Sequence, residues 1–83
     1  MTTIKILGAG CPNCKRLEQL ARKAAEKMEL EAEFIKVTDY QEIMDYGILS
    51  TPGLVVNEQV VSSGRIPSEP EIVALLTDAV KNN

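Results

Sequence analysis

Apolar and polar positions in the first half of the chain switch between the spacing of strands and the spacing of helices. Residues 3–7, Thr-Ile-Lys-Ile-Leu, alternate polar and apolar side chains, which is typical of a half-buried strand. From Cys14 to Met28, apolar side chains recur at helical spacing over about four turns, which predicts an amphipathic helix. Residues 31–37 give a second strand. The order strand, helix, strand implies a parallel pair joined by a right-handed crossover.

The middle of the chain predicts a short helix followed by a hairpin. Asp39 with Glu42 three residues later resembles a capping box that starts a helix, and Gly47 supplies its end. Residues 54–56 and 60–61 are apolar runs on either side of a short polar turn. This pattern favours an antiparallel hairpin.

A closing helix is predicted after the hairpin. Ser68 and Glu71 form a second capping box, and the apolar residues between 72 and 80 give the helix one face for packing on the sheet. The predicted element order is therefore βαβαββα, which belongs to the α/β class. A chain of 83 residues has no room for a second core, so we expect a single domain over residues 1–83.

Composition and charge exclude several classes of function. The chain is 45% hydrophobic and 25% charged, which is ordinary for a folded globular protein. Its net charge is −3 and its basic residues are scattered, so we expect no nucleic-acid partner. It lacks an apolar run of membrane-spanning length and a secretory leader pattern at its start. These features predict a cytoplasmic protein with no membrane partner, and we expect a monomer.

The two cysteines are the candidates for chemistry. Cys11 and Cys14 form a C-x-x-C motif where the first strand gives way to the long helix. Pro12 suits the first helical position, which makes Cys11 the N-cap residue. A thiolate on Cys11 would accept hydrogen bonds from the free N–H groups of Asn13 and Cys14, and the helix dipole would favour it.

The expected degree of ionisation differs between the two thiols, which supports different roles for them. An ordinary cysteine, with a pKa of about 8.5, is only about 3% ionised at neutral pH. Helix-end interactions of ~0.3–2 kcal/mol would raise that fraction substantially for Cys11. Cys14 lies three residues before Leu17 and so faces the apolar side of the helix, where it stays protonated. We therefore interpret Cys11 as the attacking nucleophile and Cys14 as the resolving thiol.

Other uses of a C-x-x-C motif stay open at this point. A disulfide that closes so short a loop would add only roughly 2 kcal/mol of stability, and two buried cysteines without chemistry are a further alternative. A soft-metal (copper) chaperone would also place paired thiolates where a strand meets a helix. Such a metal domain runs βαββαβ and ends on a strand, whereas this chain ends on a helix. We expect neither a metal nor an organic cofactor.

The motif Cys11-Pro12-Asn13-Cys14 after a first strand, with Thr51-Pro52 just before a hairpin, resembles the thioredoxin superfamily. It is most similar to the short thioredoxin/glutaredoxin-like redox proteins of bacteria and archaea. The resemblance implies a thioredoxin fold, with a four-stranded mixed sheet flanked by three helices. It also implies a dithiol oxidoreductase acting in electron transport, with disulfide-containing proteins as substrates and a thioredoxin-reductase-type electron donor.

The resemblance also implies roles for residues around the cysteines. Pro52 should follow a cis peptide bond and lie against the cysteine pair, which leaves the Thr51 backbone free to pair with an extended substrate segment. With Pro12 and Asn13, these residues are the expected substrate-binding set. Metal ligands are not expected among them.

Some positions depart from the family pattern. Lys5 stands about where many members have a buried acid, and the chain has no histidine, so the proton of Cys14 has no evident internal acceptor. The segment around Gly64 and Arg65 lacks the glycine pair and acidic residues expected for glutathione binding, and we interpret Gly64 as a turn residue and Arg65 as a solvated charge. A glutathione-coupled, glutaredoxin-like protein remains the alternative.

Four further side chains are interpreted as structural. Tyr40 and Tyr46 are expected to half cover the core as amphipathic residues, although they could form a partner surface. Met28 and Met44 are expected to fill the core.

Overall fold

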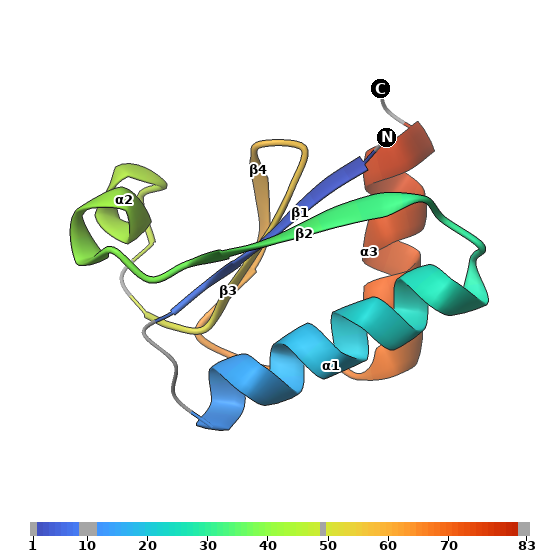
Figure 1. Cartoon of the computed structure of the whole chain (residues 1–83), viewed down its shortest axis with the longest axis horizontal. Helices are drawn as coiled ribbons and strands as arrows, with labels where there is room; N and C mark the ends of the chain where they lie inside the picture. Colours follow the sequence, from blue (N-terminus) through green and yellow to red (C-terminus); the bar gives the residue numbers. More distant parts are fainter. Residues whose placement is uncertain (1, 9–11, 49, 82–83) are drawn as a thin grey trace.

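The computed structural model describes residues 2–8, 12–48 and 50–81, and it has the predicted order of elements (Figure 1). The elements are β1 (Thr2–Leu7), α1 (Pro12–Lys27), β2 (Ala32–Val37), α2 (Tyr40–Asp45), β3 (Gly53–Val56), β4 (Gln59–Ser63) and α3 (Glu69–Lys81).

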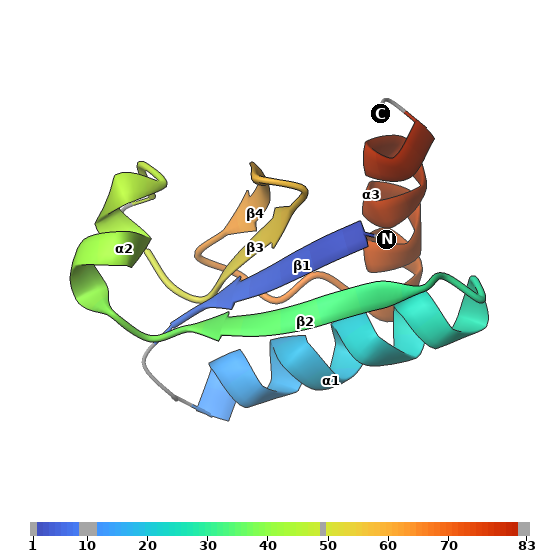
Figure 2. The same cartoon turned by 45° about the horizontal axis from the view of Figure 1, so that its top comes forward.

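The four strands form one mixed sheet in the order β2-β1-β3-β4. β1 pairs in parallel with β2, as expected for strands joined through α1, and antiparallel with β3. β3 and β4 form the predicted antiparallel hairpin. Figure 2 shows α1 running along the sheet beneath β2, so that the start of α1 lies at the same end of the sheet as the ends of β1 and β2.

Successive side chains of a strand point to opposite sides, and the two faces of the sheet are covered unequally because α1 and α3 pack on one face and α2 on the other. Ile4 and Ile6 of β1 pack with α1 and α3 in the larger core. Leu7 and Val55 face the other side, where the smaller core is closed by Ile43 of α2. The larger core comprises Ile4, Ile6, Leu17, Ala21, Ala24, Ala25, Leu54, Val56, Ile72, Leu76 and Ala79.

Helix ends follow the predicted capping residues. Asp39 is the N-cap of α2, and its side chain accepts a hydrogen bond from the backbone N–H of Gln41 at 3.0 Å. Gly47 ends this segment with a φ of +77°, a conformation that glycine adopts without strain. The hydroxyl of Ser68 accepts a hydrogen bond from the N–H of Glu71 at 3.4 Å, at the start of α3. Within the described residues, none of the helices is long and apolar enough to span a membrane.

The hairpin turn is shorter than the sequence pattern suggested. Asn57 and Glu58 both have positive φ, 50° and 69°, which is typical of a two-residue type I′ turn, and β4 begins at Gln59. The Asn57 side chain accepts a hydrogen bond from the N–H of Thr3 at 3.0 Å. The turn is therefore tied to the central strand.

Candidate functional site

Cys14 lies in the first turn of α1, which begins at Pro12 as the sequence predicted. Its side chain is buried, with 5% of its surface exposed, and it is disulfide-bonded. Pro12 and Asn13 beside it are exposed. Cys11, the expected N-cap and nucleophile, lies outside the described residues, so its predicted role stays a prediction.

Gly8 makes room for the sulfur of Cys14. A Cβ atom added to Gly8 would lie 2.2 Å from the Cys14 Sγ and 3.3 Å from its Cβ. Side chains do not approach each other so closely, so any residue other than glycine would force the sulfur or the backbone to move. Gly8, directly after β1, therefore leaves the space that the Cys14 sulfur occupies.

The Thr51-Pro52 segment reaches the same place. The peptide bond between the two residues is cis, as the family resemblance implied. Pro52 is buried, Thr51 is exposed, and the Thr51 Cβ would lie 3.9 Å from a Cβ atom at Gly8. Cys14, Gly8 and Thr51 therefore lie near one another at one end of the sheet, and Thr51 is exposed to solvent there.

A group of three charged residues is centred on Glu18, one turn along the helix from Cys14. One carboxylate oxygen of Glu18 accepts a hydrogen bond from Arg22 Nε at 3.0 Å, and the other lies 3.2 Å from Lys36 Nζ on β2. Burial alone would raise the pKa of Glu18, but hydrogen bonds from Arg22 and Lys36 outweigh it, so the pKa lies below its usual value. Glu18 is therefore a carboxylate at neutral pH. The sequence interpretation missed it, although its spacing of four residues from Cys14 is visible in the sequence.

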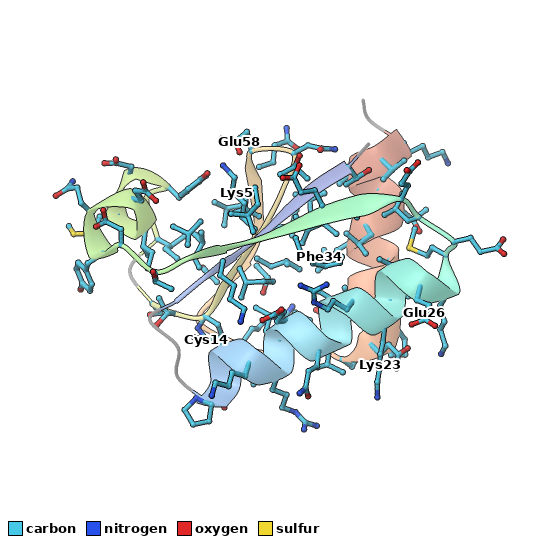
Figure 3. The ribbon with its side chains drawn as sticks, in the orientation of Figure 1. Lys5, Cys14, Lys23, Glu26, Phe34 and Glu58 are labelled. Carbon is cyan, nitrogen blue, oxygen red and sulfur yellow. The ribbon has the colours of Figure 1, made fainter. Side chains whose placement is uncertain are left out.

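Lys5 belongs to a separate polar group on the other face of the sheet. Its ammonium lies 2.6 Å from Glu58 Oε1 and donates a hydrogen bond to the Tyr46 hydroxyl at 2.8 Å. The hydrogen bonds to Glu58 and then to Tyr46 raise the pKa of Lys5. Figure 3 shows Lys5 and Glu58 together, well away from Cys14 at the start of α1. Lys5 therefore does not take the place of a buried acid near the sulfur.

The predictions for the tyrosines and methionines are confirmed in part. Met28 and Tyr46 pack against the cores as partly buried residues. The predictions for Tyr40 and Met44 are wrong, because their exposed fractions are 73% and 54%. α2 has only six residues and one buried position, Ile43, so most of its surface faces solvent.

The exposed residues of α2 adjoin the loop that carries Thr51. Tyr40, Met44, Ser50 and Thr51 line a shallow hollow of about 80 Å³ together with apolar residues of the smaller core. Aromatic residues and methionine are common where one polypeptide contacts another, and here both lie beside the exposed Thr51.

Gly64 and Arg65 have structural roles. Gly64 has a φ of +74°, and its N–H donates a hydrogen bond to the Pro52 carbonyl at 2.9 Å. Arg65 is exposed and forms an ion pair with Glu71. Both agree with the interpretation as a turn residue and a solvated charge. Across the described ranges, no group of three or more His, Cys, Asp or Glu side chains could hold a metal ion.

Comparison with known proteins finds one family and several relatives. The model of the "Thioredoxin domain" family matches residues 2–77. A thioredoxin from Methanothermobacter thermautotrophicus is 38% identical over 77 residues, which cover 93% of this chain and 100% of the relative. A thioredoxin from Methanocaldococcus jannaschii is 40% identical over 72 residues, covering 87% of this chain and 83% of the relative.

Solved structures share the fold at lower sequence identity. The germline-specific thioredoxin Deadhead of Drosophila melanogaster superposes with a TM-score of 0.63 at 19% identity, over 93% of this chain and 79% of that one. The oxidised thioredoxin of Plasmodium falciparum gives a TM-score of 0.62 at 22% identity, with the same coverage of both chains.

Proposed function

The chain belongs to the thioredoxin family and is a thiol-disulfide oxidoreductase, and from this premise we propose that it reduces disulfide bonds of proteins through a mixed disulfide at Cys11. In the first step the Cys11 thiolate attacks one sulfur of the substrate disulfide, and the other substrate sulfur leaves as a thiolate. In the second step the Cys14 thiolate attacks the Cys11 sulfur, an intramolecular disulfide forms, and the second substrate thiolate leaves. The substrate gains the two electrons that the protein loses.

The position of Cys14 is the observation that carries this proposal. Cys14 is buried in the first turn of α1, against Gly8, so its sulfur cannot readily reach the disulfide of an external substrate. The exposed Thr51 lies beside it, where an extended substrate segment can pair with the backbone. We propose that Thr51, Pro52, Pro12 and Asn13 form the substrate-binding surface, extended by the exposed Tyr40 and Met44.

The proposed partners follow from this chemistry. After each turnover the protein holds a disulfide that a reductant must reopen, and we propose a reductase of the thioredoxin-reductase type as the donor. We propose that the protein acts in the cytoplasm, where reducing systems keep protein thiols reduced and disulfides are transient. We propose that the protein acts as a monomer.

The alternatives receive less support. The described elements run in the order βαβαββα, whereas a soft-metal domain of the type considered would run βαββαβ. Arg65, the charge next to the position where a glutathione site would be sought, is paired with Glu71. Uptake of Cu(I) in equal proportion to protein would favour the metal function, and turnover that requires glutathione would favour the glutaredoxin-like function.

Trapping of the mixed disulfide tests the proposal. The Cys14→Ser variant, reduced and mixed with a cell extract, should accumulate disulfide-linked partners at Cys11, because the thiol that would release them is gone. The matched Cys11→Ser variant should trap far fewer, because Cys14 is buried. Equal trapping by both variants, or trapping by neither, would contradict the proposed order of attack.

A further inference from the structure

A buried thiol that acts as the resolving nucleophile needs a proton acceptor. Cys14 must be a thiolate when it attacks, and its side chain, which is disulfide-bonded in this structure, is only 5% exposed to solvent. Lys5 lies on the opposite face of the sheet, bound to Glu58 and Tyr46, and the chain contains no histidine. Among the described residues, we therefore look for an acceptor on the side of the sheet that carries α1 and Cys14.

Cys14 and Glu18 both line a small cavity on that side of the sheet. It has a volume of about 30 Å³ and is lined by Ile6, Gly8, Cys14, Lys15, Glu18, Lys36 and Thr38. Glu18 is the single carboxylate among these lining residues. Most of the cavity wall is apolar, so a charge that faces it is poorly screened and acts strongly on its neighbours.

The helix brings the two side chains together. Cys14 and Glu18 are four residues apart in α1, a spacing that places side chains on the same face about 5–6 Å apart at their Cβ atoms. Helical side chains also lean towards the N-terminus of their helix, so Glu18 leans towards the turn that holds Cys14. Its side chain is only 16% exposed and is held by Lys36 from β2 and by Arg22.

We propose that the Glu18 carboxylate accepts the proton of Cys14 during the resolving step, and this proposal rests on the proposed function. The Cys14 S–H bond breaks and its proton passes to Glu18. The Cys14 sulfur then bonds to the Cys11 sulfur, and the substrate thiolate leaves with the electron pair of the broken mixed disulfide. Glu18 afterwards returns its proton to solvent, so that charge and protons balance over the cycle.

The cations around Glu18 set the pH range in which it can act. The charged groups that face it are Arg22 and Lys15 on α1 and Lys36 on β2. Hydrogen bonds from Arg22 and Lys36 outweigh the effect of burial and keep Glu18 ionised at neutral pH. Lys36 is thus a positioning residue, since it holds the acceptor against the cavity and tunes its affinity for a proton.

Reaction with an aromatic disulfide that releases a coloured thiolate separates the two steps. One molar equivalent of this probe should release one thiolate when Cys11 attacks and a second when Cys14 resolves. In Glu18→Gln, we expect the first phase to be unchanged and the second to slow on the order of a hundredfold near neutral pH, which is the lower range for a positioned proton acceptor. The second phase should then rise with hydroxide concentration and approach the wild-type rate in alkali.

Glu26→Gln is the matched control, because Glu26 is an exposed glutamate near the far end of the same helix (Figure 3). It should leave both phases unchanged. A second phase in Glu18→Gln that is unchanged or faster would overturn the proposal, since a carboxylate that only repels the thiolate would speed the reaction when removed. The second phase requires the mixed disulfide that forms in the first phase. Absence of the first phase in the wild-type protein would therefore reject the proposed function rather than the role of Glu18.

Lys36→Gln gives a second, independent readout. Without this lysine the pKa of Glu18 should rise, so the acid limb of the second-phase rate should move to higher pH while the first phase keeps its profile. An acid limb that stays in place would overturn the proposed link between Glu18 and the resolving step. Both variants keep a side chain that can hydrogen-bond, and a normal first phase shows that each is folded.

Discussion

The two faces of the sheet each carry a charged group, but only one of them lies beside the sulfur. On the α1 face, Glu18 is held by Lys36 and Arg22, one helical turn from Cys14. On the α2 face, Lys5 is held by Glu58 and Tyr46 in the wall of an open cavity of about 500 Å³. Both groups are ion pairs near β1 and β2. Under the proposal made above, the face of the sheet separates Glu18, on the side that carries α1 and Cys14, from Lys5, on the side that carries α2.

The largest expected effect is on the free energy of unfolding, and it compares how much each face of the sheet contributes to the stability of the fold. Leu17 is fully buried between α1 and the sheet. Leu17→Ala should lower the free energy of unfolding by about 2–5 kcal/mol, because it removes buried surface and leaves a cavity. Tyr40→Ala on α2, where the side chain is 73% exposed, should change it by no more than about 0.5 kcal/mol. Urea unfolding of both variants measures this, and equal losses would contradict the inequality of the two faces.

Gly8→Ala tests whether the absence of a side chain at residue 8 is what accommodates the Cys14 sulfur. The added methyl group would overlap the Cys14 Sγ, so we expect a loss of about 1–3 kcal/mol from overpacking and a changed equilibrium with a reference dithiol. Gly47→Ala is the control, because a Cβ at Gly47 meets no atom within 4 Å and its φ of +77° adds only backbone strain. Gly47→Ala should destabilise the fold without altering the redox equilibrium. A redox shift of equal size in both variants would show that Gly8 has no special relation to Cys14.

Lys5→Met tests whether the α2 face is separate from the chemistry. It removes the ion pair with Glu58 and the hydrogen bond to Tyr46. We expect a smaller fall in melting temperature than for Gly8→Ala, because the pair is open to solvent. Both phases of reaction with the coloured disulfide should keep their rates. A slowed second phase would mean that Lys5 acts on Cys14 across the sheet.

Lowering the pH should reduce the stability of the fold by a small amount, because Glu58 on the α2 face becomes protonated. Its hydrogen bond with Lys5 lowers the pKa of Glu58 below the ordinary value of 4.5, so the unfolded chain binds the proton more readily. The contribution to stability is therefore present above that value and is lost as pH falls through the lowered pKa. Denaturant midpoints measured down through this range should fall less steeply in Glu58→Gln than in the wild type. Identical slopes would contradict the assignment.

Local sequence patterns were enough to predict most of the fold. The alternation in residues 3–7, the apolar stripe from Cys14 and the caps at Asp39 and Ser68 each act within a few residues, and all four appear in the structure. The turn was less predictable, because Asn57 and Glu58 adopt positive φ without a glycine. The exposure of Met44 depends on how little of α2 meets the sheet, which no local pattern reveals.

The candidate site was predictable only where residues are close in sequence. The C-x-x-C motif and Thr51-Pro52 stand out as motifs, and the cis bond before Pro52 agrees with the family pattern. Glu18 was missed because its ion pair with Lys36 joins two residues that are distant in sequence. Lys36 lies on β2, which comes close to α1 only in the folded parallel crossover. For the same reason, the sequence could not show that Lys5 points away from Cys14.

The central proposal is that the Cys11 thiol ionises readily, while the thiol of the buried Cys14 stays protonated until it resolves the mixed disulfide. Alkylation of the reduced protein, followed separately for each cysteine by peptide mass spectrometry over a range of pH, tests it most directly. The account predicts that Cys11 reacts rapidly well below the ordinary thiol pKa of about 8.5, and that Cys14 reacts slowly throughout. Equal, slow reaction of both thiols with a shared midpoint near the ordinary value would contradict it.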